Sequence, residues 1–223
     1  MNNTHRGPTP GQRAAKRAFD LVLSALGLLL TGWLILLAFI IASLDTRRNG
    51  FFTQERIGLH GRRFRVIKIR TMRHDPAITT TVTSDHDPRI TRVGRLFRKT
   101  KIDELPQLIN VLRGDMSFVG PRPDVPGFAD ELEGNDRIIL SVRPGITGPA
   151  TLQFRDEEAE LATQLDPESY NREVIWREKV RINRAYVENY RFWRDVAYII
   201  RTIAPSRNPA TRSGHPSEQL KEN

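Results

Sequence analysis

The sequence of 223 residues contains no cysteine. This absence excludes a disulfide framework, a thiolate metal site and a cysteine nucleophile, and it suits the reducing cytoplasm. The sequence also lacks an internal repeat and a recognisable nucleic-acid-binding motif. A membrane-tethered nucleic-acid binder would rest on charge alone, so nucleic acid is not an expected partner.

Acidic residues are fewer than basic ones. The sequence contains 26 Asp and Glu and 35 Lys and Arg, which gives a formal net charge of +9. Such an excess indicates an anionic partner, which could be nucleic acid, phospholipid headgroups or a phosphorylated substrate. The length allows one globular domain with its own core and one accessory element. We therefore expect a single catalytic domain.

Charged residues are absent from Leu21 to Leu44. As a straight helix this apolar run would reach roughly 36 Å, more than a hydrocarbon core of about 30 Å. A cleaved signal peptide is the alternative, but the run starts late in the chain and lacks a clear small-x-small cleavage site. The run therefore predicts a membrane helix.

Basic residues flank the run on both sides: Arg13, Lys16 and Arg17 precede it, and Arg47 and Arg48 follow it. The positive-inside rule places both flanks in the cytoplasm. A single span would put one flank on the wrong side, whereas a re-entrant helix would enter and leave through one leaflet. Composition alone leaves the single span and the re-entrant helix equally open.

The pair Thr31-Gly32 is the candidate break of a re-entrant membrane helix over residues 13–48. Each limb would measure roughly 18 Å, which is too short to cross the membrane. The threonine hydroxyl could satisfy backbone groups freed at a break, and glycine relaxes the steric limits on the backbone.

The remaining chain predicts a small, mostly helical α/β domain. Residues 1–12 and 206–223 are polar and contain Pro and Gly, which indicates a disordered start and a disordered tail. Residues 49–205 would form the catalytic domain on the cytoplasmic face. Aromatic and β-branched residues at 50–56 and 64–69 surround glycine turn signals and predict a short β-hairpin.

Three further segments predict helices. Residues 89–100 have the pattern of a basic amphipathic helix suited to an anionic membrane surface. Residues 103–114 predict a helix with Asp103 as its N-cap and Gly114 as its C-terminal stop. Residues 172–203 predict one long helical stretch, in which aromatics mixed with arginines suit the membrane interface.

Asp103 and Glu104 are the candidate catalytic pair. At a helix N-terminus the macrodipole would lower the pKa of each carboxyl and attract phosphate. A carboxylate there could form an acyl phosphate, and Mg²⁺ bound by the two carboxylates and by pyrophosphate oxygens would reduce the repulsion between anions. Plain helix capping is the alternative for these two residues taken alone.

Three arginines near this pair are candidate phosphate ligands. Arg98 lies five residues before Asp103, and Arg122 and Arg143 each lie in a loop that proline stiffens. A guanidinium group can hold a phosphate through two parallel hydrogen bonds. A single arginine is more often a solvated charge, so the argument depends on the three occurring together with the apolar anchor and the carboxylate pair.

A set of motifs, taken in order along the chain, resembles the monotopic phosphoglycosyl transferases, also called bacterial sugar transferases or undecaprenyl-phosphate hexose-1-phosphate transferases. The motifs are Lys16-Arg17-Ala18-Phe19-Asp20, Phe52-Thr53-Gln54-Glu55-Arg56-Ile57-Gly58, Lys68-Ile69-Arg70-Thr71-Met72, Asp103-Glu104-Leu105-Pro106-Gln107, Asn110-Val111-Leu112-Arg113-Gly114-Asp115-Met116-Ser117, Val119-Gly120-Pro121-Arg122-Pro123 and Val142-Arg143-Pro144-Gly145-Ile146-Thr147-Gly148. They cover about residues 16–150, with a weaker likeness to about 203.

The resemblance implies an enzyme that transfers a sugar-1-phosphate from a UDP-sugar to a polyprenyl (undecaprenyl) phosphate and releases UMP. This reaction is the first membrane step of polysaccharide or glycoconjugate biosynthesis. Asp103 matches the catalytic Asp that carries the covalent phosphosugar, Glu104 matches its dyad partner, and Arg98 matches a phosphate-contacting Arg. Lys68 is a further candidate for phosphate or substrate binding.

The resemblance also implies Mg²⁺ as the cofactor, membrane lipids as partners, and a monotopic protein in the bacterial inner membrane whose catalytic domain faces the cytoplasm. One feature departs from the family, which usually breaks its re-entrant helix at Ser-Pro where this sequence has Thr31-Gly32. Glycine keeps its N–H and lacks the steric break of proline. The chain also lacks the multi-span N-terminal region of larger members, which implies the minimal catalytic form.

A non-catalytic, membrane-anchored assembly protein of a polysaccharide machine is the alternative function. It predicts that Asp103→Asn leaves the function intact, whereas the enzyme predicts loss of activity. The sugar, the exact polyprenyl chain, the pathway and the number of subunits, including a homodimer, stay open at the level of sequence.

Overall fold

The computed structural model describes residues 7–75 and 87–204. The α-helices are α1 (Pro10–Thr46), α2 (Arg92–Thr100), α3 (Gln107–Arg113), α4 (Pro149–Gln153), α5 (Glu157–Ala162), α6 (Pro167–Tyr170), α7 (Trp176–Glu188) and α8 (Phe192–Ile203). The strands are β1 (Phe51–Ile57), β2 (Arg63–Ile69), β3 (Ser117–Val119) and β4 (Gly145–Thr147). Short helical turns are η1 (Leu59–Gly61), η2 (Ile102–Glu104), η3 (Ala129–Glu131), η4 (Gly134–Ser141) and the π-turn η5 (Asn171–Ile175). The mostly helical α/β class is confirmed, while the tail expected at 206–223 and residues 1–6 lie outside the described residues.

Helix α1 begins at Pro10, earlier than the membrane segment expected from residue 13. Thr9 and Gln12 form a capping box, in which each side chain accepts the backbone amide of the other, at 3.3 Å and 2.8 Å. Pro10 suits the first helical position because its missing N–H would be unpaired there in any case. Residues 10–12 are therefore helical, and the expectation that they are disordered is wrong.

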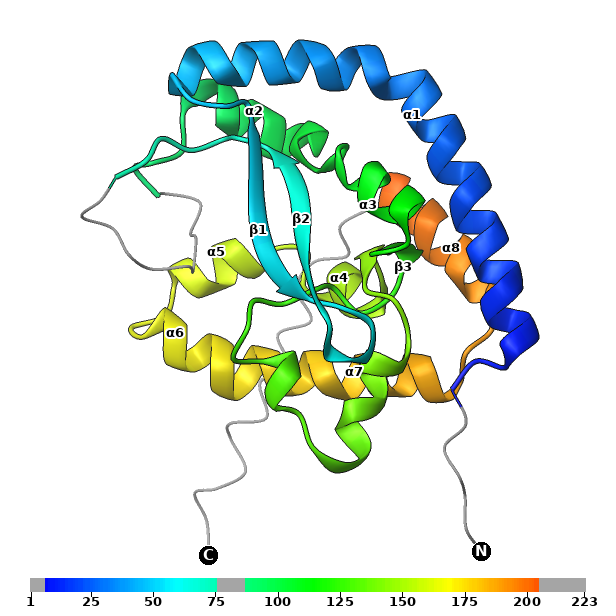
Figure 1. Ribbon diagram of the computed structural model, residues 1–223. Helices are drawn as coiled ribbons and strands as arrows, with labels where there is room; N and C mark the ends of the chain where they lie inside the picture. The colour runs from blue at the N-terminus through cyan, green and yellow to red at the C-terminus, as the bar shows by residue number, and fades with distance from the viewer. Residues whose placement is uncertain (1–6, 76–86, 205–223) are drawn as a thin grey trace, which may run out of the picture.

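Helix α1 runs without interruption through Thr31 and Gly32, so the predicted break is wrong in this structure. The Thr31 hydroxyl donates to the Gly27 carbonyl at 2.7 Å, and glycine keeps the N–H that proline would remove from the helix. Figure 1 shows that the helix instead bends strongly near its middle and arches over the rest of the domain. Side-chain hydroxyls bonded to the preceding turn commonly accompany such bends.

The two faces of α1 have opposite environments. Ile35, Ala38 and Ala42 recur at helical spacing and pack on Ile69 of β2 and Phe97 of α2. Large apolar side chains are exposed on the other face, and these are Val22, Leu26, Leu29, Leu30, Trp33, Leu36, Leu37, Ile40 and Leu44. The helix is long and apolar enough to cross a membrane, and an apolar face of this extent indicates membrane association.

The N-terminal half of α1 is tied to the domain by polar contacts. The Arg17 guanidinium donates to the last carbonyls of α3, at 2.6 Å to Val111 and 2.9 Å to Leu112. The buried Asp20 carboxylate accepts from the Ser117 hydroxyl at 3.0 Å and from the Phe118 amide at 3.1 Å. These bonds explain why the first motif has Arg at position 17 and Asp at position 20, since both side chains join α1 to the domain.

The predicted hairpin is confirmed, with β1 and β2 antiparallel and Phe51 opposite Ile69. The helix predicted at 89–100 is present as α2 and starts later, because the Thr91 hydroxyl caps it by accepting the Gly94 amide at 2.8 Å. Only glycine fits at position 94, since a Cβ would lie 2.0 Å from the Thr71 carbonyl oxygen. This contact holds α2 against the end of β2.

The helix predicted at 103–114 divides into two pieces. Asp103 lies in the one-turn η2 and is not an N-cap; α3 begins only at Gln107, after Pro106. Gly114 ends α3 as predicted, with a φ of 91° that favours glycine. The pair therefore does not sit at the N-terminus of a helix, so the macrodipole argument for it is wrong.

Two parallel strands of three residues each, β3 and β4, join the proline-containing loops. They are too short to produce a periodic pattern in the sequence. The backbones approach closely at Gly120 and Gly145, where a Cβ on Gly145 would lie 2.1 Å from the Gly120 nitrogen. The two loops with their arginines are thereby fixed relative to each other.

The stretch predicted as one helix at 172–203 contains two long helices. The chain leaves α7 at Asn189 and enters α8 after Arg191, which is extended. The turn is stabilised by the buried Asp195, whose oxygens accept the Tyr186 and Tyr190 hydroxyls at 2.8 Å and 3.3 Å. Lys16 of α1 also bonds Asp195, so this turn anchors the start of the membrane helix.

Candidate active site

Asp103 and Glu104 lie in η2, the single turn between α2 and α3. Helix α2 ends at Thr100, and its C-cap Lys101, with a left-handed φ of 59°, turns the chain into η2. Asp103 is only 8% exposed, and its Oδ1 atom has no hydrogen-bond partner among the described residues. A buried carboxylate oxygen without a partner costs stability, which indicates that a ligand or a reaction uses it.

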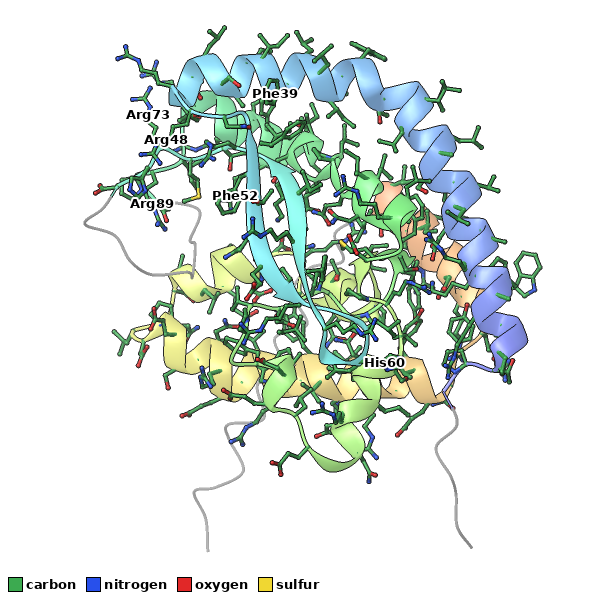
Figure 2. All side chains as sticks on the ribbon, viewed as in Figure 1. Phe39, Arg48, Phe52, His60, Arg73 and Arg89 are labelled. Atoms are coloured by element: carbon green, nitrogen blue, oxygen red, sulfur yellow. The ribbon has the colours of Figure 1, made fainter. Side chains whose placement is uncertain are left out.

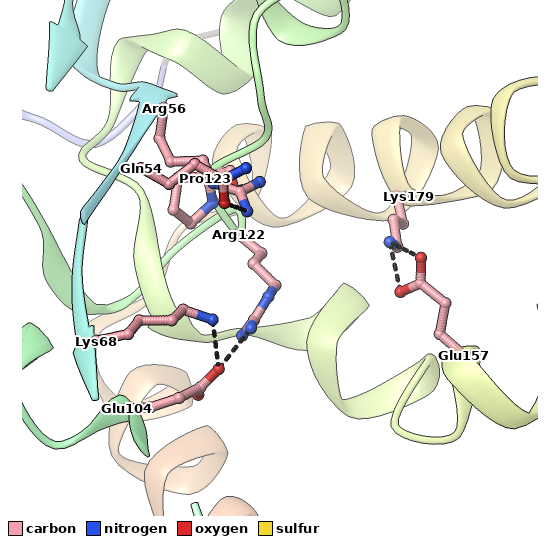
Figure 3. A network of polar contacts seen from close by, with 8 residues as sticks. All are labelled: Gln54, Arg56, Lys68, Glu104, Arg122, Pro123, Glu157 and Lys179. Carbon is pink, nitrogen blue, oxygen red and sulfur yellow. Dashed lines mark hydrogen bonds and ion pairs between the residues drawn. The ribbon is translucent and has the colours of Figure 1, made fainter. Parts of the chain in front are cut away.

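Glu104 is held by two cations. Its Oε1 atom accepts from Arg122 Nη2 at 2.6 Å and from Lys68 Nζ at 3.3 Å, as Figure 3 shows. The Glu104 side chain is 13% exposed, whereas that of Arg122 is 39% exposed. The pair is therefore anchored inside the domain while part of the guanidinium stays accessible to a ligand.

Separate elements bring these groups together. Lys68 lies on β2 between Ile67 and the buried Ile69, so strand alternation turns Lys68 away from the face that Ile69 packs against. Arg122 follows β3 in the loop between Pro121 and Pro123, where the close approach at Gly120 fixes the backbone. The site thus depends on a hairpin, a turn and a loop.

The carboxyl groups of Asp103 and Glu104 have different pKa values because their burial and their charged neighbours differ. Burial raises the pKa of Asp103 to about 6, the Glu104 carboxylate adds to this shift, and the cations Lys68, Lys101 and Arg98 oppose it. Burial alone would raise the pKa of Glu104 too, but Arg122 and Lys68 outweigh it and hold that pKa well below its usual range. The expectation that the pKa of Asp103 is lowered is therefore wrong, because the residue is buried and lies at no helix N-terminus.

Further polar residues that the sequence interpretation did not select adjoin this group (Figure 3). Arg56 of β1 donates to Gln54 Oε1 at 2.6 Å and to the Pro123 carbonyl at 3.3 Å. Burial raises the pKa of Asp124 to about 6, against the opposing charges of Lys179 and Arg56. Strand alternation places Gln54 and Arg56 on the same face of the hairpin as Lys68, and this was the signal available in the sequence.

The other two predicted phosphate ligands lie differently. The charge of Arg98, on α2, acts on the Asp103 carboxyl, so Arg98 belongs near the pair. Arg143 donates from Nε to the Gly114 carbonyl at 2.8 Å, and its charged neighbours are Arg17 and Asp20. The structure therefore joins Lys68, Glu104 and Arg122 directly and places Arg143 with the anchor of α1.

The carboxylates fit one kind of metal site. Within residues 7–75 and 87–204, no group of three or more His, Cys, Asp and Glu side chains gathers in a way that could hold a metal ion by itself. Mg²⁺ commonly uses one or two carboxylates together with substrate phosphates and water. Oδ1 of Asp103 is a buried carboxylate oxygen with no hydrogen-bond partner in residues 7–75 and 87–204, so the residues fit Mg²⁺ brought together with a diphosphate.

The sequence match decides the family. Residues 11–206 match the family described as bacterial sugar transferase. The chain belongs to the bacterial sugar transferase family. The predicted resemblance is therefore confirmed, and the match covers all the elements of the site.

Three relatives of the chain illustrate the range of the family. It is 40% identical to an undecaprenyl-phosphate glucose phosphotransferase of Komagataeibacter xylinus over 84% of the chain and 35% of the relative. It is 34% identical to a UDP-glucose:undecaprenyl-phosphate glucose-1-phosphate transferase of Caulobacter vibrioides over 84% of the chain and 68% of the relative. An N-acetylgalactosaminephosphotransferase that uses undecaprenyl phosphate, from Aeromonas hydrophila, is 32% identical over 88% and 44% of the two chains. The chain thus spans about a third of the first relative and less than half of the third.

Proposed function

We propose that this protein transfers a sugar-1-phosphate from a UDP-sugar to a polyprenyl phosphate at the cytoplasmic face of a bacterial inner membrane. The observation that carries the proposal is the buried Asp103 carboxylate. Its Oδ1 has no hydrogen-bond partner in the described part of the chain, while Glu104 beside it is held by Lys68 and Arg122. The relatives named above carry out transfers of this class according to their names.

Asp103 is the nucleophile in the proposed first step. Its ionised carboxylate attacks the β-phosphorus of the UDP-sugar, a bond forms between the carboxylate oxygen and phosphorus, and the bond to the bridging oxygen breaks. UMP leaves with that electron pair, and an acyl phosphate carries the sugar. In the second step a phosphate oxygen of the polyprenyl phosphate attacks the same phosphorus, which releases the Asp103 carboxylate and forms the diphosphate-linked lipid.

The cations around the pair provide electrostatic stabilisation. Arg122 and Lys68 meet at Glu104 Oε1 and are fixed before substrate arrives, so little reorganisation is needed as charge develops on the transferring phosphoryl group. Arg98, on α2, adds a further positive charge that acts on the Asp103 carboxyl. Mg²⁺ bound by Asp103, with Glu104 adjacent, would supply charge neutralisation for the diphosphate.

The contacts of α1 support a re-entrant, monotopic arrangement. Arg17 and Asp20 near one end and Ala38 and Ala42 near the other all bond or pack on the same domain. A straight helix across the bilayer could not touch one domain with both halves. The bend in Figure 1 brings both ends to one side, as the basic flanks predict.

The test is UMP release from a panel of UDP-sugars by the full chain with Mg²⁺ and undecaprenyl phosphate. The named relatives use different sugars, so the panel identifies the donor. We expect release with at least one sugar, and loss of at least about 10³-fold in Asp103→Asn because the nucleophile is removed. Asp156→Asn is the matched control, since Asp156 is exposed on the turn before α5.

A second readout separates the covalent reaction from a direct transfer. Incubation with the UDP-sugar without acceptor should add the mass of one sugar phosphate to the intact wild-type chain and none to Asp103→Asn. UMP release without this adduct would overturn the covalent step. No release from folded wild-type protein across the panel would favour the non-catalytic assembly protein.

A further inference from the structure

A second basic site lies at the C-terminal end of α1, away from the carboxylate pair. A hollow of ≈ 370 Å³ is lined by Thr46, Arg47, Arg48, Arg73 and His74. Figure 2 shows Arg48 and Arg73 gathered at this end of the helix. Between described residues, no hydrogen bond or ion pair joins the lining side chains to Lys68, Glu104 or Arg122.

The charges in this hollow are poorly compensated. Arg73 contacts Asp45 at 3.8 Å, and this is the one ion pair that the lining residues make within the described parts of the chain. Arg47 and Arg48 are exposed and pair with no described carboxylate. In the part of the chain that the structure describes, the three lining guanidinium groups make one ion pair in all, and like charges at short range favour a bound anion.

The guanidinium groups of two neighbouring arginines, unlike those of Arg47 and Arg48, are already bound to other groups of the protein. Arg89 lies next to Arg73 through a backbone bond of 2.9 Å, but its guanidinium is held by Asp87 at 2.7 Å. Arg70 donates to the Asn49 and Phe51 carbonyls at 2.7 Å and 3.2 Å. Of these neighbouring arginines in the described part of the chain, Arg47 and Arg48 are the ones whose guanidinium groups remain available to an external anion.

The position of the hollow identifies the class of anion. Ile40 and Leu44 of α1 are 46% and 75% exposed and lead directly into Thr46 and Arg47. Basic side chains that follow an exposed apolar helix lie at the level of lipid headgroups. Once α1 is in the membrane, headgroup phosphates would lie at the level of the hollow.

We propose that Arg47, Arg48, Arg73 and His74 form a binding site for the headgroup phosphate of an anionic phospholipid. The guanidinium groups supply the donors and the charge, and the adjacent leucine face of α1 contacts the acyl chains. The bound lipid fixes the C-terminal limb of α1 at the membrane surface. This site does not depend on the transfer reaction, because none of its residues belongs to the carboxylate network.

The test compares retention of phosphatidylglycerol and phosphatidylcholine with identical acyl chains by the full chain in detergent, measured by native mass spectrometry. We expect phosphatidylglycerol to be retained preferentially, and Arg47→Gln with Arg48→Gln to weaken its retention about 30-fold. The matched control is Arg62→Gln with Arg63→Gln, which removes the same charge at the tip of the hairpin. UMP release by each variant is followed separately, so failure of the transferase proposal is distinguishable.

Three results would overturn the lipid site. One is equal retention of both lipids, and another is an equal loss in the hairpin control, since either would mean general charge attraction. The third is displacement of phosphatidylglycerol by undecaprenyl phosphate or inorganic phosphate at equal concentration and matched ionic strength, which would assign the hollow to another phosphate. Preferential retention that only the Arg47 and Arg48 variant loses would establish it.

Discussion

Two adjacent carboxyl groups, Asp103 and Glu104, differ because of their neighbours. Glu104 accepts from Arg122 and Lys68, so its negative charge is stabilised inside the domain. Asp103 is also enclosed by the domain, but its Oδ1 has no hydrogen-bond partner among the described residues, and burial raises its pKa to about 6. An unstabilised carboxylate is the better nucleophile of the two, because less interaction is lost when it attacks.

Asp103 should lower the stability of the folded protein at high pH. Because its pKa is raised on folding, the folded state holds the proton more tightly, and the stability from this group is lost as pH rises through about 6. The loss between about pH 5 and about pH 8 is roughly 1–2 kcal/mol. Asp103→Asn should therefore raise the melting temperature in detergent more at the higher pH.

Thermal unfolding of wild type, Asp103→Asn and the exposed control Asp156→Asn at both pH values measures this difference. A gain that is the same at both pH values, or one that Asp156→Asn shares, would contradict the assignment of a buried, ionising Asp103.

At the scale of elements, α3 joins the hairpin to η2, the turn that carries Asp103 and Glu104. Asn110 is fully buried, accepts the Ile67 amide at 3.0 Å and donates to the Arg65 carbonyl at 2.8 Å. One side chain thereby bonds the edge of β2 as a neighbouring strand would. The strand that carries Lys68 is thus held next to the turn that carries Glu104.

Replacing Asn110 by Ala should disturb both stability and catalysis. It removes the side-chain partner of the part-buried Ile67 amide and Arg65 carbonyl, which should cost about 2–4 kcal/mol of unfolding free energy. Urea or thermal unfolding with UMP release measures both effects. Asn135→Ala, at an exposed position in η4, is the control, and a loss below about 0.5 kcal/mol at position 110 would contradict the bridging role.

At the scale of the whole molecule, α1, the proposed membrane helix, contacts the rest of the domain along its length. Its N-terminal half contacts α3, β3 and the turn at Asp195, and its C-terminal half packs on β2 and α2. Bending rather than breaking allows this, since the backbone bonds of the helix stay within the chain while its direction changes.

The absence of cysteine makes the topology testable. Ala14→Cys lies on the exposed start of α1, and Arg62→Cys lies on the exposed hairpin turn. In the re-entrant arrangement a membrane-impermeant maleimide should label both positions in inverted inner-membrane vesicles and neither in intact spheroplasts. Labelling of Ala14→Cys only in spheroplasts would establish a transmembrane helix instead.

The sequence correctly predicted the elements that depend on interactions between residues close together in the chain. The apolar run, the hairpin glycines, the amphipathic pattern at 89–100 and the Gly114 stop all depend on interactions within a few residues, and the structure has a helix, a hairpin or a helix end at each. The Thr31-Gly32 break and the Asp103 cap were wrong. At Thr31-Gly32 the backbone hydrogen bonds of the helix continue because glycine keeps its N–H, and at Asp103 the chain forms the separate turn η2 before α3 begins.

The sequence by itself determined that the chain has a long apolar helix with basic flanks, a hairpin and an Asp-Glu pair followed by a helix, because periodicity, charge and turn chemistry act over short range. Only the tertiary structure decided which cations meet Glu104 and that Arg143 is not among them. It also decided that Asp103 is buried with a raised pKa. These properties depend on distances between residues far apart in the chain, and such distances exist only after β2, η2 and the loop after β3 have packed together.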